Sequence, residues 1–182
     1  MDVLSSCVMT SEHRHADPGR LEEQAWSCFA DRLPLREIAS DAVKAWFTAL
    51  LNVFLPEVDD LDQLVPKAAF LFGFDLDAAR DREENAAVLS ADSARTVLAE
   101  FADRVRASAG PVGPDLFRGW MTEVKEATGV EGAELSDPVR IALTGTHSGP
   151  DFDKVIPLIE DGAALGIGVP SVSERVERFV GV

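Results

Sequence analysis

Between Leu35 and Leu55, apolar residues recur every three or four positions, which is the spacing of one face of an α-helix. A strand needs strict alternation instead, and no stretch of useful length in this chain alternates in that way. Helical stripes of the same kind recur along the rest of the chain, over residues 21–33, 61–72, 76–89, 90–108, 115–128, 151–161 and 173–179. The sequence therefore predicts an all-α fold of about eight helices.

The clearest break in this pattern is the run GPVGP, from Gly110 to Pro114, because glycine and proline interrupt helices. It predicts two small helical subdomains. Their bounds would be 33–110 and 111–182, preceded by an N-terminal extension and short helix over 1–32. Within the second subdomain, Ser136 or Asp137 is expected to cap a helix that has Pro138 in its first turn.

Several classes of protein are excluded or disfavoured by what the sequence lacks. No run approaches the 18 apolar residues of a membrane span, and the first residues lack the basic start of a signal peptide, so we expect a cytoplasmic protein. Cys7, His13, His15 and Cys28 do not have the spacing of a zinc site. No Ser-His-Asp or Cys-His arrangement has a supporting context. We therefore expect no metal, no cofactor and no catalysis by this chain alone.

The net charge of -15 argues against a broad polyanion-binding surface, because such surfaces are usually basic. The basic residues comprise 13 Arg and only 4 Lys, however. Arginine forks onto phosphates and stacks on bases, so that a few arginines achieve more than a diffuse set of lysines. A GC-rich genome explains the same bias without any function. Binding of a nucleic acid would depend on a local cluster of arginines.

One stretch of 31 residues carries an ordered set of motif residues, WMTEVKEATGVEGAELSDPVRIALTGTHSGP. The motif elements are Trp120, Val124-Lys125, Thr128-Gly129, Gly132, Leu135, Pro138-Val139-Arg140-Ile141-Ala142-Leu143-Thr144-Gly145 and Gly149-Pro150. This stretch resembles the C-terminal anticodon-binding region of bacterial glutamyl-tRNA synthetases. Upstream, LREIASDAVKAWF resembles the helix at the start of that region, FLFGFD resembles its Phe-rich stretch, and SARTVLAEFADRV resembles the helix after it, so that the similarity covers about 150 residues.

The resemblance implies an all-helical module that grips the anticodon arm of a tRNA, tRNA-Glu in particular, with neither DNA nor a membrane as partner. The sequence contains no His-x-Gly-His and no Lys-Met-Ser-Lys signature, which hold ATP in class I synthetases. The module is therefore expected to act as an accessory, or in trans with a truncated synthetase or another protein partner.

The resemblance also suggests which residues contact tRNA. Arg140, Thr144 and His147 lie in or just after the Pro-x-Arg motif, and Arg118, Lys125 and Arg104 lie on the preceding helices. Five of the six have a structural alternative. Arg140 braces the fold, Thr144 belongs to a helix end, and Arg118, Lys125 and Arg104 form a solvated face.

One departure from the family favours a different class of function. The loop after Gly129 reads Val-Glu-Gly-Ala-Glu where the family commonly has lysines. The alternative is an acidic protein-interaction or regulatory module that has lost RNA binding.

Overall fold

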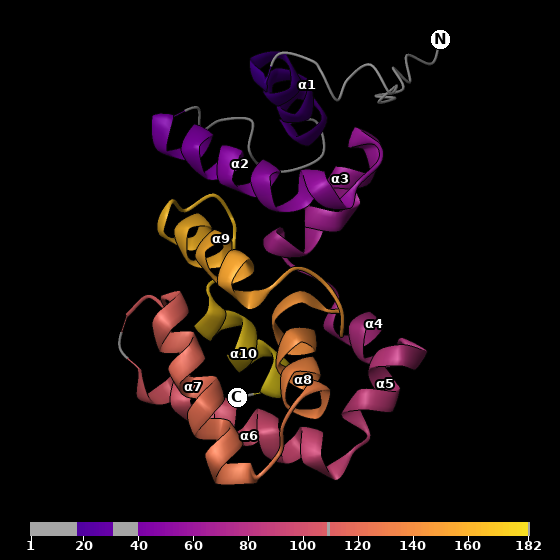
Figure 1. Cartoon of the computed structure of the whole chain (residues 1–182), viewed down its shortest axis with the longest axis vertical. Helices are drawn as coiled ribbons and strands as arrows, with labels where there is room; N and C mark the ends of the chain where they lie inside the picture. Colours follow the sequence, from indigo (N-terminus) through magenta and orange to yellow (C-terminus); the bar gives the residue numbers. More distant parts are fainter. Residues whose placement is uncertain (1–17, 31–39, 109, 182) are drawn as a thin grey trace.

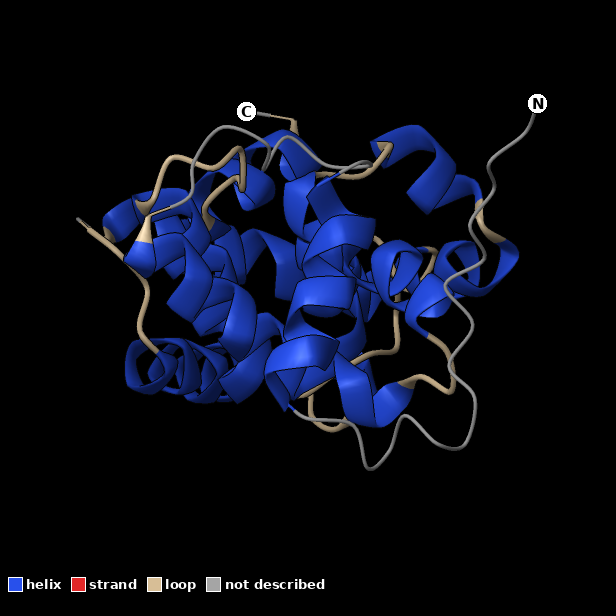
Figure 2. Cartoon of the chain, turned by 90° about the horizontal axis from the view of Figure 1, so that it is seen from above, coloured by secondary structure: helices blue, strands red, loops and turns tan. Residues whose placement is uncertain are grey.

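A computed structural model describes residues 18–30, 40–108 and 110–181. Over these residues every regular element is a helix and no strand occurs (Figure 2). The all-α prediction is therefore confirmed. Helices α1, α2 and α3 lie together at one end, α9 packs against α2, and α4–α8 with α10 form the remainder (Figure 1).

The described residues form ten α-helices and two short 3-10 helices, η2 and η3. In chain order they are α1 Pro18–Ala30, α2 Asp41–Phe54, η2 Leu55–Glu57, α3 Leu61–Ala68, η3 Ala69–Phe72, α4 Leu76–Asp81, α5 Glu83–Leu89, α6 Asp92–Ala107, α7 Pro114–Thr128, α8 Ala133–Thr144, α9 Phe152–Ala164 and α10 Val172–Val180.

The helix predicted over 76–89 is two helices, because the backbone leaves the helical region at Arg82, where ψ is 128°. In a continuous helix the carbonyl of Ala79 would accept from the N–H of Glu83. Instead it accepts from Nδ2 of Asn85 at 2.6 Å. A side chain thus caps α4 where the main chain turns, and apolar spacing carries no signal for such a cap.

The helix start expected at Leu35 lies outside the described residues, and α2 begins at Asp41 after Ser40, whose side chain accepts from Val43 N. The prediction that Ser136 or Asp137 caps α8 was wrong. The amides of Leu135 and Ser136 both bond to Gly132 O, which starts the helix ahead of Pro138. Pro138 therefore lies inside α8, where it lacks the N–H that would bond to the carbonyl of Glu134.

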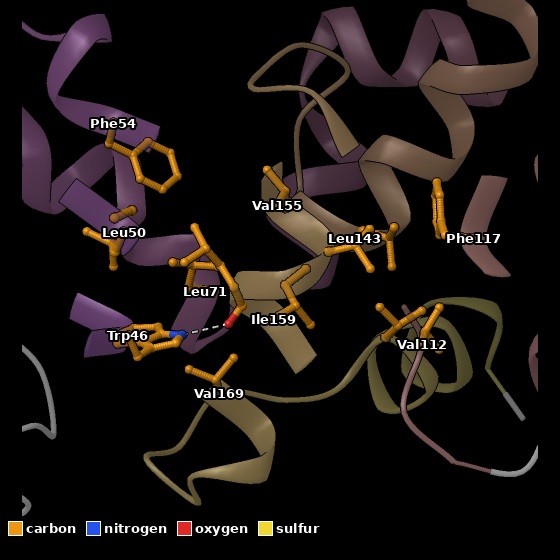
Figure 3. Packing of buried hydrophobic residues seen from close by; sticks show 14 of the residues in the cluster. Trp46, Leu50, Phe54, Leu71, Val112, Phe117, Leu143, Val155, Ile159 and Val169 are labelled. Carbon is orange, nitrogen blue, oxygen red and sulfur yellow. Dashed lines mark hydrogen bonds between the residues drawn. The ribbon is translucent and has the colours of Figure 1, made fainter. Parts of the chain in front are cut away.

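A single large hydrophobic cluster runs from α1 to α10, and it includes residues from both sides of the Gly110–Pro114 loop, such as Phe101 and Phe117. Helices α6 and α7, which flank that loop, pack against each other. The division into segments 1–32, 33–110 and 111–182 stays a prediction. In Figure 3, Trp46 of α2 points toward α9, the helix that carries Ile159, and both residues belong to this cluster.

The hydrogen bond between α2 and α9 provides a test of this packing. Trp46 is almost fully buried, and its Nε1 donates to Leu158 O at 2.8 Å (Figure 3). We expect Trp46→Phe to lower the free energy of unfolding by about 1–3 kcal/mol, because the bond and part of the ring volume are lost. Urea denaturation monitored by circular dichroism measures this change.

Trp26 is the matched control, because it is only partly buried and packs edge-on against Phe47. Trp26→Phe removes the same atoms and is expected to cost less than about 1 kcal/mol. Equal losses in the two variants would show that the bond to Leu158 contributes nothing measurable.

Candidate functional site

A cavity of about 420 Å³ opens between two segments that the sequence analysis singled out separately. One wall comes from the aromatic-rich stretch of η3 and the residues after it, and the other comes from the loop that follows α8. The cavity is lined by Phe54, Glu57, Pro66, Lys67, Ala69, Phe70, Gly73, Phe74, Arg82, Thr144, Gly145, Thr146, Ser148, Gly149 and Pro150. We call this cavity the loop pocket.

The loop after α8 is held in shape by its own polar groups. Thr144 is buried, and its hydroxyl donates to Arg140 O at 2.8 Å and lies 3.2 Å from the hydroxyl of Thr146. The hydroxyl of Thr146 in turn donates to Ser148 O at 2.8 Å. These bonds give the pocket a wall of fixed backbone, as expected for a preformed site.

Gly145 brings the two walls into contact. It ends α8 in the left-handed conformation with φ of 76°, and its N–H bonds to Ile141 O at 2.9 Å. A Cβ at this position would lie 2.8 Å from Cδ2 of Phe74. Only glycine fits here, because the left-handed backbone and the ring of Phe74 both exclude a side chain.

A side chain of helix α5 also holds the backbone of Gly145 in place. Asn85 is 1% exposed, and its Nδ2 donates to Gly145 O at 2.9 Å as well as to Ala79 O. NH1 of Arg82 approaches the same Gly145 carbonyl at 3.4 Å. In the sequence, Asn85 stands in the polar run RDREEN, and no spacing distinguishes it from its exposed neighbours.

Two cations lie at the mouth of the loop pocket. Lys67 and Arg82 are exposed, and within the part of the chain that the structure describes neither forms an ion pair with a carboxylate. The ammonium of Lys67 donates to the main-chain carbonyl of Glu57. Sequence reasoning did not single out either residue. Because no carboxylate neutralises them, both are free to meet an anion.

Arg140, the foremost predicted residue, braces the loop. Its guanidinium donates to Pro150 O and lies over the ring of Phe152, 4.2 Å from the centroid. Half-burial lowers the pKa of Arg140, and the negative charges of Asp137 and Asp151 oppose that shift. The structural alternative considered for Arg140 is therefore realised, and its contact with RNA stays a prediction.

The cations predicted on α6 and α7 are paired with carboxylates. Arg118 contacts Asp115 at 2.9 Å and Asp153 at 3.1 Å. Arg104 contacts Glu123 at 2.8 Å.

Lys125 is paired in the same way. Its ammonium contacts Glu131 at 2.8 Å, and that hydrogen bond and charge raise the pKa of Lys125 and lower that of Glu131. Glu131 belongs to the loop where the family commonly has lysines, so the departure noted in the sequence neutralises a predicted contact.

The six predicted residues therefore fall into two groups. Arg140, Thr144 and His147 belong to the end of α8 and the loop after it, and Thr144 lines the loop pocket. Arg104, Arg118 and Lys125 lie on α6 and α7 and do not line it.

The described residues hold no group of three or more His, Cys, Asp and Glu side chains that could bind a metal ion. The earlier zinc candidates Cys7, His13 and His15 lie outside the described residues, as does the side chain of Cys28. In the described part of the chain, no helix has the length and apolar content needed to cross a membrane.

The chain is thus an all-helical domain whose loop pocket is lined by aromatic rings, hydroxyls and two cations. The "Anticodon binding domain" family matches residues 21–165, and the chain belongs to this family. The resemblance seen from Trp120 to Pro150 is thereby confirmed. The matched family is a binding domain, which agrees with the expectation of a non-catalytic chain.

The chain is similar to several glutamate–tRNA ligases. It is 29% identical to glutamate–tRNA ligase 2 of Syntrophus aciditrophicus over 158 residues, 86% of this chain and 31% of that protein. It is 22% identical to glutamate–tRNA ligase 1 of Caldicellulosiruptor saccharolyticus over 169 residues, 91% of this chain and 33% of that protein. Glutamate–tRNA ligase 1 of Halorhodospira halophila is 40% identical over 92 residues, which is 50% of this chain and 18% of that protein. The chain spans about a third or less of these relatives.

Proposed function

We propose that this chain binds the anticodon arm of a tRNA, tRNA-Glu in particular, and that unstacked anticodon bases enter the loop pocket. The observation that carries the proposal is the pair of unneutralised cations, Lys67 and Arg82, at the mouth of a pocket built from the family's motif residues. Membership of the anticodon-binding family and the names of the relatives support the choice of ligand.

The lining of the pocket suits a splayed nucleotide. Phe70 and Phe74 supply aromatic surface, against which unstacked bases pack. Ser148 and the main chain of Gly149 and Pro150 supply hydrogen-bonding groups for base edges. Lys67 and Arg82 supply charge for the flanking phosphates. The pocket thus separates groups that read a base from groups that hold the backbone.

The acidic balance of the chain predicts a distinctive salt response. The chain carries a net charge of -15, so electrostatic repulsion opposes the approach of RNA except near the two cations of the loop pocket, Lys67 and Arg82. With two phosphate contacts, the logarithm of the binding constant should fall with that of the salt concentration with a slope of about -1.4. A broad basic surface would give a much steeper slope.

The direct test is a fluorescence anisotropy titration of the purified chain with labelled tRNA-Glu, repeated from low to physiological salt. We expect saturable binding with this shallow slope, and competition by the isolated anticodon stem-loop but not by the isolated acceptor stem. A folded protein that ignores tRNA-Glu at every salt concentration would remove the proposal.

The module would act in the cytoplasm, as an accessory or in trans with a synthetase that lacks this region. Its addition to such a truncated synthetase should then increase the rate of tRNA-Glu charging. The second candidate function is an acidic protein-interaction module. It is favoured by the ion pairs of Arg118, Lys125 and Arg104, which leave α6 and α7 with few free cations. Cross-linking that recovers only RNA would count against it.

A further inference from the structure

Helix α10 places a buried arginine directly behind the loop pocket. Arg175 is only 3% exposed, and within the described residues it has no carboxylate partner in an ion pair. Its guanidinium donates to main-chain carbonyls instead. The acceptors are Pro170 O at 2.9 Å, Phe70 O at 2.8 Å, Leu143 O at 2.8 Å and Leu71 O.

Three of these carbonyls belong to the segments that form the two walls of the pocket, and the fourth, Pro170 O, precedes α10. Phe70 and Leu71 lie in η3 and lead into Phe74, while Leu143 lies in the last turn of α8, immediately before Thr144 and Gly145. Phe70 and Leu143 accept from the same nitrogen of Arg175, although they are far apart in the sequence. One rigid guanidinium therefore joins the two walls.

The local sequence presents the guanidinium at this point. Ser171 and Glu174 form a capping box that starts α10, so the helix direction is set one turn before Arg175. Nε of Arg175 then bonds back to Pro170 O. An arginine is suited to this place because it offers five donors in a planar fork, whereas a lysine has three at a single point.

Burial of an unpaired cation is costly, and it lowers the pKa of Arg175 to about 10. The group still carries its proton at neutral pH. Such a buried charge is useful where its hydrogen bonds fix one arrangement of the chain, as those of Arg175 do between η3 and α8.

We propose that Arg175 is a positioning residue for the loop pocket: it holds the Phe70–Phe74 wall and the Leu143–Pro150 wall in register, so that one base is accepted and others are not. Arg175 lies beyond residues 21–165, the stretch that matches the anticodon-binding family. The inference rests on the proposed function for its RNA readout, and on the contacts with the carbonyls of Phe70, Leu71 and Leu143 for its geometry.

The test compares Arg175→Lys and Arg175→Met with Val176→Ala in the full chain. Val176 is the adjacent residue on α10, is equally buried and lies in the hydrophobic cluster, so its truncation destabilises the same helix without touching the carbonyls. For each variant, the melting temperature is measured. Affinities are then measured for the anticodon stem-loop of tRNA-Glu and for the same loop with one anticodon base changed.

We expect both Arg175 variants to lose discrimination between the two stem-loops by about fivefold or more, an effect of about 1 kcal/mol. Lysine, which keeps the charge and one or two of the bonds, should lose less than methionine. Val176→Ala should keep the discrimination ratio of the wild type despite its lower melting temperature. Equal ratios in all variants, once compared at matched stability, would overturn the proposal.

Hydrogen–deuterium exchange of the free protein separates this inference from the proposed function. In the Arg175 variants, the amides of 70–74 and 143–146 should exchange faster than in Val176→Ala, whether or not RNA binds. If the wild type does not bind RNA while these amides exchange faster in the Arg175 variants, the proposed function fails, but the inference that Arg175 links the two walls is supported. If these amides exchange at the same rate in the Arg175 variants as in Val176→Ala, Arg175 does not link the two walls.

Hydrogen–deuterium exchange of the wild-type protein tests the proposal even if the Arg175 variants do not fold. On addition of the stem-loop, the amides of 70–74 and of 143–146 should gain protection together, because one guanidinium joins them. Protection confined to one wall would contradict the proposal.

Discussion

Gly145→Ala is expected to lower the free energy of unfolding by about 2–5 kcal/mol. The left-handed backbone at φ of 76° costs a residue with a Cβ about 1–2 kcal/mol. The new methyl group would also lie 2.8 Å from Cδ2 and 2.9 Å from Cγ of Phe74. Relief of such a contact by movement of a packed ring costs about 1–3 kcal/mol more. Urea denaturation with a constant m-value measures the sum.

Gly129→Ala separates the two causes. Gly129 ends α7 in the same conformation, with φ of 71°, but nothing lies within 4 Å of the position its Cβ would take. Its substitution should therefore cost only the backbone strain of about 1–2 kcal/mol. In a Phe74→Ala background, the loss caused by Gly145→Ala should fall to that of Gly129→Ala. Equal losses for the two glycines in the wild-type background would mean that Phe74 does not constrain the loop.

The sequence predicted local features of this region well, because each depends on near neighbours. The helix predicted over 115–128 matches α7 almost to the residue, although Leu116, which its apolar spacing places on the inward face with Trp120 and Val124, is exposed and Phe117 is buried instead. The Thr144-Gly145 pair was correctly read as a helix terminus. Helical periodicity and the freedom of glycine to adopt positive φ are properties of short stretches, so a sequence displays them directly.

The sequence does not show which cations pair with a carboxylate in the folded chain and which do not. Asp115 lies three residues before Arg118 and is visible in the sequence as a neighbour on the helix, but Asp153 is 35 residues away. Glu123, the closest partner of Arg104, lies on the next helix. Tertiary packing therefore decided which predicted cations pair with carboxylates, and within the described residues it left Lys67 and Arg82 bonded to main-chain carbonyls alone.

Buried polar groups were the other omission. Asn85 and Arg175 look like ordinary members of polar runs, yet they bond to carbonyls 60 and 32 to 105 residues away. A hydrogen bond to a main-chain carbonyl does not depend on the identity of the acceptor residue, so no pairing of residue types in the sequence reveals it. These two side chains shape the loop pocket, and only the folded chain identifies them.

The combined substitution Lys67→Ala and Arg82→Ala is expected to weaken binding of tRNA-Glu by about 10- to 100-fold at low salt, because each removes a phosphate contact at the pocket mouth. The slope of affinity against salt should become shallower by about 1.4. Both side chains are exposed, so the melting temperature should hardly change. Anisotropy titrations at several salt concentrations give both quantities.

Arg118→Ala combined with Lys125→Ala is the matched control, because it removes the same number of positive charges from residues that the sequence also nominated. These cations already contact Asp115, Asp153 and Glu131, so RNA would have to displace a carboxylate to reach them. Their loss should weaken binding by less than about threefold, through the overall charge alone. A larger effect from this pair than from Lys67 and Arg82 would place the RNA across α7 rather than at the loop pocket. Comparable effects of the two double variants would instead mean that the RNA contacts both α7 and the loop pocket. The salt slope of the variant with all four substitutions would then show how many phosphate contacts are lost in total.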